Sequence, residues 1–400
     1  MNKKSLSFVI IFLVLLLPIN SLAFGFFDSS IRPGAVKTNE YLPLLKDKRV
    51  ALIINQTSVV DGKSILDILL ENKINVVRIF VPEHGFRGNE DAGAKIDNTI
   101  DSATGIKVIS LYGKHKKPES QDLQDIDVLI YDLQDVGARF YTYISTMEYC
   151  MVAATENKKM FMVFDRPNPN GFYLDGPVLT NENKSFVGMQ PIPIVYGMTA
   201  GEYAQMLKGE GWFTNAKELN LKVITCENYS HKSKYQITVA PSPNLTRMAA
   251  IYAYPSLCLF EGTTISVGRG TTMPFMQFGS PTLKEKYKYS FTPKSGKGAK
   301  SPMHEGKECF GQLVGDNANT VLENIDNHIH LEWLIDAYTA SQDKEKFFTD
   351  FFTKLAGTSK LQEQIKKGLS ANAIRKSWKG DLQQFKKIRK KYLLYSDFKS

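Results

Sequence analysis

The segment Arg49-Val-Ala-Leu-Ile-Ile-Asn55 holds an unbroken apolar run from Val50 to Ile54, typical of a strand that is buried on both faces of a sheet. Other short strand-like runs cover residues 75–81, 107–111, 128–133, 160–164 and 221–226. Helical spacing of apolar residues covers 64–72, 143–156 and 199–208, and Thr199 with Glu202 forms a predicted capping box at the start of the last of these helices. This alternation predicts an α/β fold, in which a doubly wound, mostly parallel sheet carries helices on both faces.

The second part of the chain differs from the first in amino-acid composition and in its pattern of predicted elements. Glycine, threonine and aromatic residues dominate 260–279, a lysine-rich extended stretch follows, and helical patterns cover 320–341 and 360–367. With 400 residues, 43% of them hydrophobic, the chain is long enough for two packed units. We therefore expect a first domain at 24–255 and a second, smaller α+β domain at 256–400.

The N-terminus has the pattern of a secretory signal. Lys3 and Lys4 precede an apolar run at 8–17, and Ser21-Leu22-Ala23 is a small-x-small cleavage pattern. These features predict a signal peptide at 1–23 and a periplasmic or secreted protein without stable membrane insertion after cleavage; an uncleaved anchor is the alternative. No cysteine lies close behind the run, and the first in the sequence is Cys150, which argues against a lipid anchor.

The charge of the chain bears on its binding partners, and the cysteine spacing bears on disulfides and metal sites. The formal net charge is +9, and the lysines concentrate at 284–300 and 360–391, away from the unusual motifs. A solvated basic face is the simplest interpretation, and anionic cell-wall polymers suit an exported protein better than nucleic acid, which we do not expect as a partner. The cysteines form no C-x-x-C pair, so the pattern leaves buried thiols and disulfides open; they are Cys150, Cys226, Cys258 and Cys309.

Chemically distinctive residues directly follow three of the predicted strands. The motifs are Pro82-Glu-His-Gly-Phe-Arg-Gly88, Asp132-Leu-Gln-Asp-Val-Gly-Ala-Arg-Phe-Tyr-Thr-Tyr143 and Asp165-Arg-Pro-Asn-Pro-Asn-Gly171. In open α/β sheets, ligands bind beyond the carboxyl ends of the strands. We therefore expect one rim to carry Glu83, His84, Arg87, Asp132, Asp135, Arg139 and Asp165. For any single residue, a buried ion pair that braces a loop is the competing interpretation.

Carboxylates beside arginines and tyrosines suit sugar chemistry. A glycosidase needs one carboxylic acid to protonate the leaving oxygen and a second group at the anomeric carbon. Glu83 is the first candidate for the general acid, and Asp132 and Asp135 are the next catalytic candidates because one loop projects both. The candidate substrate-binding residues are His84, Arg87, Gln134, Arg139, Tyr141, Tyr143, Asp165, Asn168, Asn244, Glu261 and Arg269.

The stretch Phe260 to Thr271 surrounds Arg269 with glycines, which allow close approach to a ligand. Arg269 is expected either to hold a substrate carboxylate or to pair with Glu261 or another acid. The stretch matches no phosphate-binding loop, and a G-x-S-x-G nucleophile motif is absent from the sequence. His328 and His330 lie in a predicted helix, where residues two apart do not face each other, so we expect neither a metal site nor a cofactor.

Five blocks, in this order, resemble the NamZ family of exo-acting β-N-acetylmuramidases of peptidoglycan turnover, formerly a domain of unknown function. They are Val81–Gly88 with Ala92-Gly93, Asp132–Tyr143, Asp165–Pro169, Pro241–Asn244 and Phe260–Thr271. The similarity extends from about Gly34 to the C-terminus, and Asn170-Gly171 departs slightly from the paired glycines that the family pattern suggests.

The resemblance implies a Rossmann-like N-terminal domain, with the active site in a cleft closed by the smaller domain. It also implies hydrolysis of the β-1,4 bond of non-reducing terminal N-acetylmuramic acid (MurNAc) in peptide-free fragments such as MurNAc-GlcNAc, with Glu83 as the catalytic glutamate. Retaining, inverting and acetamido-assisted mechanisms stay open. A non-catalytic periplasmic binding protein for wall sugars is the rival hypothesis, and a wall amidase is a third.

Overall fold

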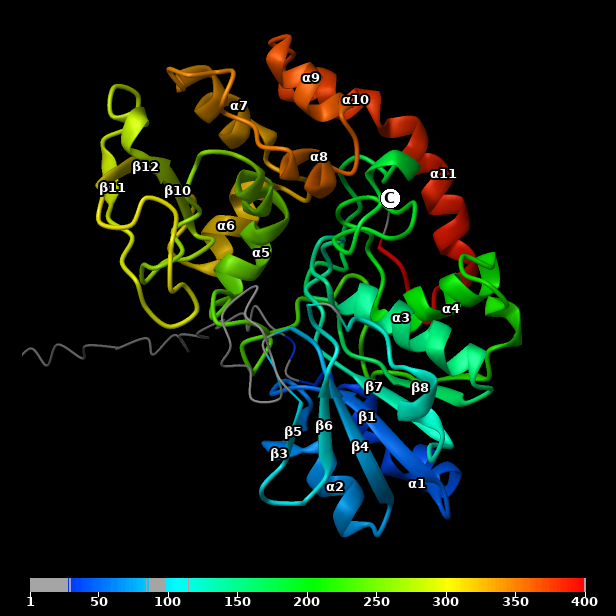
Figure 1. Cartoon of the computed structure of the whole chain (residues 1–400). Helices are drawn as coiled ribbons and strands as arrows, with labels where there is room; N and C mark the ends of the chain where they lie inside the picture. The colour runs from blue at the N-terminus through cyan, green and yellow to red at the C-terminus, as the bar shows by residue number, and fades with distance from the viewer. Residues whose placement is uncertain (1–27, 29, 84, 86–97, 114, 399–400) are drawn as a thin grey trace, which may run out of the picture.

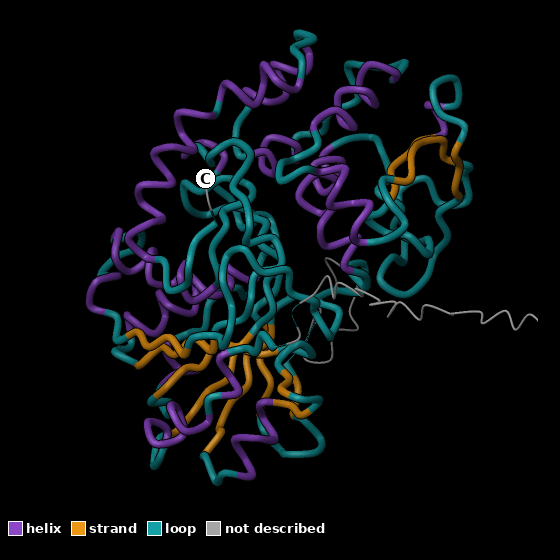
Figure 2. Tube along the Cα trace, turned by 180° about the vertical axis from the view of Figure 1, so that it is seen from behind, coloured by secondary structure: helices purple, strands orange, loops and turns teal. Residues whose placement is uncertain are grey.

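The computed structural model describes residues 28, 30–83, 85, 98–113 and 115–398. The predicted signal peptide and the candidates His84 and Arg87 lie outside the described residues. Figures 1 and 2 show a sheet with helices on both faces and, apart from it, a second group of helices with a small sheet.

The central sheet has seven strands in the order β5-β6-β4-β1-β7-β8-β9. They span Thr99–Ile100 (β5), Lys107–Ser110 (β6), Asn75–Val81 (β4), Arg49–Ile54 (β1), Val128–Asp132 (β7), Met160–Phe164 (β8) and Leu221–Ile224 (β9). Only β5, at one edge, is antiparallel to its neighbour; all the other pairs are parallel. The six parallel strands follow the doubly wound order of a Rossmann-like sheet, which confirms the predicted fold class.

The two faces of the sheet explain the unbroken apolar run of β1. Ala51 and Ile53 pack into the core on the side of α3 (Tyr143–Glu156) and α4 (Ala200–Glu210). Val50, Leu52 and Ile54 pack into a second core with α1 (Thr38–Leu45) and α2 (Ile65–Glu71). Because successive strand residues point to opposite faces, a strand covered on both sides must be apolar throughout. A short hairpin, β2 (Val59–Val60) and β3 (Lys63–Ser64), precedes α2.

The second unit contains a three-stranded antiparallel sheet in the order β10-β12-β11. Its strands are Gln277–Ser280 (β10), Tyr289–Phe291 (β11) and Cys309–Leu313 (β12), and its helices are Met248–Leu257 (α5), Ala318–Ile325 (α6), Leu331–Ala340 (α7) and Phe351–Ala356 (α8). The single helix predicted over 320–341 is wrong, because Asp326 and Asn327 adopt left-handed φ values of 41° and 58° and end α6. Asp and Asn tolerate that conformation better than other residues with a β-carbon.

His328 and His330 therefore lie between two helices rather than inside one. The His330 ring stacks on Trp333 at a centroid distance of 4.0 Å. Across the described residues, no group of His, Cys, Asp and Glu side chains could hold a metal ion. Cys150, Cys226, Cys258 and Cys309 are all buried and unbridged. Nowhere in the described chain is a helix both long and apolar enough to cross a membrane.

The C-terminal helices lead the chain back to the first unit. They span Lys360–Lys366 (α9), Ala371–Ser377 (α10) and Lys379–Arg389 (α11), and Figure 1 shows α11 approaching α4. The Arg389 guanidinium donates to the carbonyl of Gly197, and the Tyr395 hydroxyl donates to Asp165 at 2.6 Å. The end of the smaller unit is thus anchored on the larger one.

Candidate active site

A cavity of about 890 Å³ lies between side chains of both units. From the first unit it is lined by Glu83, Tyr112, Phe140, Tyr141, Thr142, Tyr143, Phe186, Val187, Ser242 and Leu245. From α5 onward it is lined by Tyr254, Cys258, Glu261, Arg269, Phe275, Phe351, Leu355 and residues 298–303. Its first-unit wall is built from the segments that follow β4, β6, β7, β8 and β9, with the largest share from the segment after β7, at the carboxyl ends of the strands where doubly wound sheets bind ligands.

Glu83 follows β4 by two residues and contributes a half-buried carboxyl group to the cavity wall. The Thr142 hydroxyl donates to Oε2 of Glu83 at 3.4 Å. Thr142 begins the turn into α3, so the loop after β7 helps to set the direction of the carboxylate. The arrangement brings a hydrogen-bonded carboxylate to the surface of a ligand-sized hollow.

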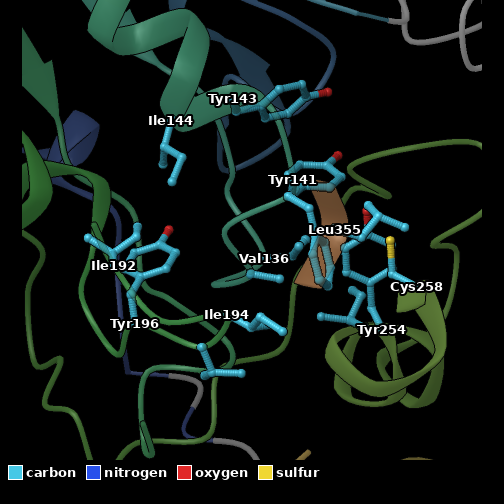
Figure 3. Packing of buried hydrophobic residues seen from close by; sticks show 14 of the residues in the cluster. Val136, Tyr141, Tyr143, Ile144, Ile192, Ile194, Tyr196, Tyr254, Cys258 and Leu355 are labelled. Atoms are coloured by element: carbon cyan, nitrogen blue, oxygen red, sulfur yellow. The ribbon is translucent and has the colours of Figure 1, made fainter. Parts of the chain in front are cut away.

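Four aromatic rings form a continuous aromatic wall beside Glu83. The centroid distances are 4.7 Å from Tyr143 to Tyr141, 5.9 Å from Tyr141 to Tyr254 and 5.0 Å from Tyr254 to Phe275. Figure 3 shows Tyr141 and Tyr254 close to Cys258 and Leu355. The rings pack edge to face; Tyr141 and Tyr254 are 7% exposed and Tyr143 and Phe275 only 1%, so they form a rigid, largely apolar backing to the cavity.

Hydrogen bonds fix the first two rings of this wall. The hydroxyls of Tyr141 and Tyr143 both donate to the Pro241 carbonyl, at 2.8 and 3.0 Å. Asn55, immediately after β1, donates to the Tyr143 hydroxyl at 2.7 Å. Burial raises the pKa of both tyrosines, so they stay protonated donors at neutral pH. The wall therefore begins at the end of β1, beside the point where the strand order reverses.

Arg269 and Glu261 provide the charged part of the cavity wall. The Nε of Arg269 donates to Oε1 of Glu261 at 2.6 Å, and each side chain is 24% exposed. The Arg269 guanidinium also lies over the Phe275 ring, 4.8 Å from its centroid. Burial alone lowers the pKa of Arg269, but Glu261 more than offsets this and raises it overall. The structure thus shows the expected alternative of an ion pair, and places that pair in the cavity wall.

Asp132 was expected at the rim but lies inside the fold. It is fully buried and accepts hydrogen bonds from Nε and Nη2 of Arg166 at 2.5 and 3.0 Å. Asp165 is also fully buried, and accepts from the Thr199 hydroxyl at 2.6 Å and from the Gly201 amide at 2.8 Å. Burial raises the pKa of Asp165 to about 6. Neither carboxylate lines the cavity: Asp132 braces two loops and Asp165 anchors the start of α4.

Asp135 and Gln134 are likewise buried away from the cavity lining. Oδ2 of Asp135 accepts from the Tyr196 hydroxyl and from the Gly137 amide, while Oδ1 has no hydrogen-bond partner among the described residues. Burial raises the pKa of Asp135 to about 6. Gln134 donates to the carbonyls of Asp135 and Pro167. These contacts hold the loop after β7 rather than a substrate.

Three further candidates are used to join segments of the chain. Arg139 is buried, and its guanidinium donates to the carbonyls of Pro177, Ile192 and Leu355 at 2.8–2.9 Å. Burial lowers the pKa of Arg139 to about 9. Asn168 donates to the Met198 carbonyl, and Asn244 donates to the Gly298 carbonyl. None of the three lines the cavity, although Ser242 and Leu245 beside Asn244 do.

Several cavity residues were not singled out from the sequence. Thr142 lies between two predicted candidates, so its position in the motif was an available signal. Tyr254 and Phe275 occur in apolar stretches where nothing local distinguishes a cavity residue from a core residue. Lys300 ends the lysine-rich stretch interpreted as a solvated face, yet it lines the cavity.

Comparisons with known proteins agree along most of the chain. The family model described as exo-beta-N-acetylmuramidase NamZ, N-terminal, matches residues 50–249, and the corresponding C-terminal model matches residues 252–395. The chain is 40% identical over 380 residues to the peptidoglycan beta-N-acetylmuramidase NamZ of Bacillus subtilis, covering 89% of each. The fold and these matches define a glycoside hydrolase. Within that class, the chain belongs to the NamZ family, which confirms the resemblance found in the sequence.

Two crystal structures of DUF1343 family proteins from Bacteroides fragilis are similar to this one. The first has a TM-score of 0.85 at 46% identity, and the second a TM-score of 0.75 at 30% identity. Each comparison covers 92% of this chain, together with 100% and 99% of the respective crystal structures. The likeness therefore includes both units of the fold.

Proposed function

We propose that the enzyme is a secreted exo-β-N-acetylmuramidase, which hydrolyses the β-1,4 bond of non-reducing terminal MurNAc in peptidoglycan fragments such as MurNAc-GlcNAc. The substrate class follows from the name of the Bacillus subtilis relative. The basic and apolar pattern of the first residues, followed by a cleavage pattern at 21–23, supports export to the periplasm or medium. The observation that carries the proposal is that Glu83 lies in the wall of the same cavity as the aromatic wall and Arg269.

Glu83 is the general acid of this proposal. Its protonated carboxyl group gives a proton to the oxygen that links the two sugars, the bond from that oxygen to the anomeric carbon breaks, and water finally supplies the new hydroxyl group. Thr142 orients the carboxyl by its hydrogen bond, and the aromatic wall gives the sugar a rigid apolar surface to pack against. Asp132 and Asp135 have no part in this scheme, because both are buried away from the cavity.

The experiment compares Glu83→Gln with wild type on a chromogenic β-glycoside of MurNAc. Glutamine keeps the size of the side chain but cannot act as an acid, so kcat should fall by about 10²–10⁴-fold. The exposed Glu218 is the matched control, and Glu218→Gln should keep wild-type turnover. Circular dichroism and melting temperature should be unchanged in both variants.

Two results would contradict the proposal. Near-wild-type turnover by Glu83→Gln would remove this residue from the mechanism. Calorimetry with MurNAc-GlcNAc that gives a saturating binding heat, with no product released by the wild-type protein, would instead identify a binding protein.

A further inference from the structure

The Glu261 ion pair leaves most of the Arg269 guanidinium available. Only Nε donates to Glu261; no hydrogen bond from the described part of the chain reaches Nη1 or Nη2 of Arg269. An arginine has five N–H donors, four of which lie on these two terminal nitrogens. The side chain is 24% exposed in the cavity wall, so the Nη1–Nη2 end of the guanidinium, called the fork below, is open to a ligand.

The position of this fork is fixed from two directions. Glu261 holds Nε from the short helical turn Cys258–Gly262, and the Phe275 ring lies below the guanidinium plane at 4.8 Å from its centroid. Oε2 of Glu261 in turn accepts a weak hydrogen bond from the Cys258 thiol at 3.6 Å. A guanidinium held in this way loses little conformational freedom when it binds a carboxylate through two parallel hydrogen bonds.

The aromatic wall connects this fork to the proposed general acid. Tyr143 lies near Glu83, and the wall continues through Tyr141 and Tyr254 to Phe275, on which Arg269 rests. The wall of one cavity therefore carries both a carboxyl group and an open guanidinium. A sugar with its own carboxylate has a partner for each of these groups.

We propose that Arg269 is the specificity-determining receptor for the lactyl carboxylate of the terminal MurNAc, and that Glu261 is the positioning residue that turns its Nη1–Nη2 edge toward the substrate. This inference rests on the proposed function. The lactyl ether is what distinguishes MurNAc from N-acetylglucosamine, and its carboxylate becomes a neutral amide when a stem peptide is attached. The same contact therefore selects MurNAc over N-acetylglucosamine and peptide-free over peptide-bearing ends.

The test needs two chromogenic glycosides, one of MurNAc and one of its lactyl amide. Wild-type kcat/KM should favour the acid by about 10- to 100-fold, as expected when a partly buried cation loses a charged partner. Arg269→Gln should remove most of this preference by lowering kcat/KM for the acid while leaving the amide nearly unchanged. Equal kcat/KM of the wild type for the two glycosides would overturn the proposal without any variant.

Lys300 provides the comparison, because it lines the same cavity. If Lys300→Gln abolishes the preference for the acid and Arg269→Gln retains it, the receptor is not Arg269. Failure of the proposed function itself looks different: either Glu83→Gln keeps its turnover or neither glycoside is cleaved. If Arg269→Gln still cleaves both glycosides but no longer prefers the acid, the proposed function holds and the role of Arg269 is supported.

Glu261 is tested by a pair of variants that differ in one property. Glu261→Gln keeps an acceptor for Nε, whereas Glu261→Ala has none. We expect KM for the acid to rise about tenfold in Glu261→Ala and not to rise in Glu261→Gln, with kcat largely preserved in both. Equal KM values for the two variants, whether raised or not, would overturn the positioning role.

Discussion

Replacing Arg139 with methionine separates a bracing role from a substrate-binding role. Methionine has a similar length but donates no hydrogen bond, so the carbonyls of Pro177, Ile192 and Leu355 would lose their charged donors. Each acceptor left buried and unsatisfied costs about 1–3 kcal/mol. Removal of the buried guanidinium recovers part of that cost because its desolvation is no longer needed. We expect the free energy of unfolding to fall by about 3–5 kcal/mol, out of a typical 5–15 kcal/mol.

Urea unfolding at neutral pH, followed by circular dichroism, measures this change. The slope m should stay constant while the midpoint falls. Arg247→Met is the matched control, because Arg247 is exposed and, among the described residues, its side chain donates to the Met273 sulfur alone; the change should alter stability by about 0.5 kcal/mol or less. Folded Arg139→Met should keep kcat/KM within about threefold of wild type, since Arg139 does not line the cavity.

One outcome would refute this reasoning. A stability loss below about 1 kcal/mol, together with a tenfold or greater rise in KM, would mean that Arg139 binds substrate, as its place in the motif first suggested.

Two further predictions concern neighbouring features of the same fold. Gly357 has a φ of 78°, and a β-carbon there would lie 2.4 Å from Nη2 of Arg139, so Gly357→Ala should lower the melting temperature. Gly380 in α11 is the control: a β-carbon there would have no atom within 4 Å, so Gly380→Ala should not lower the melting temperature. Burial raises the pKa of Asp135 from 3.8 to about 6, so the folded state binds the proton more tightly, and the free energy of unfolding should fall as pH rises from about 4 to 6. In Asp135→Asn this contribution, about 3 kcal/mol, is absent, and urea unfolding at several pH values should show a flatter profile than wild type; parallel profiles would contradict the assignment.

The central sheet could be predicted from the sequence because its signals are local. The short apolar run at 50–54, rich in branched residues, favours a buried strand, and Thr199 with Glu202 caps α4 through atoms three residues apart. The helix predicted over 320–341 was wrong for the converse reason. Its apolar spacing continues through Asp326 and Asn327, while the left-handed backbone that ends α6 leaves little trace in that spacing.

The site was predictable only in part, since an acid or arginine beyond a strand can face either a ligand or the interior. The motif placed Glu83 and Tyr141 in the cavity wall, whereas Asp132 turned to Arg166 and Arg139 to a carbonyl 216 residues away. Local sequence therefore determined the six parallel strands of the central sheet, the helices α2, α3, α4 and α9, and the loops that carry polar groups. The tertiary structure decided which of those groups meet the cavity, because a buried charge must find its partners wherever the fold provides them, and those partners are distant in the chain.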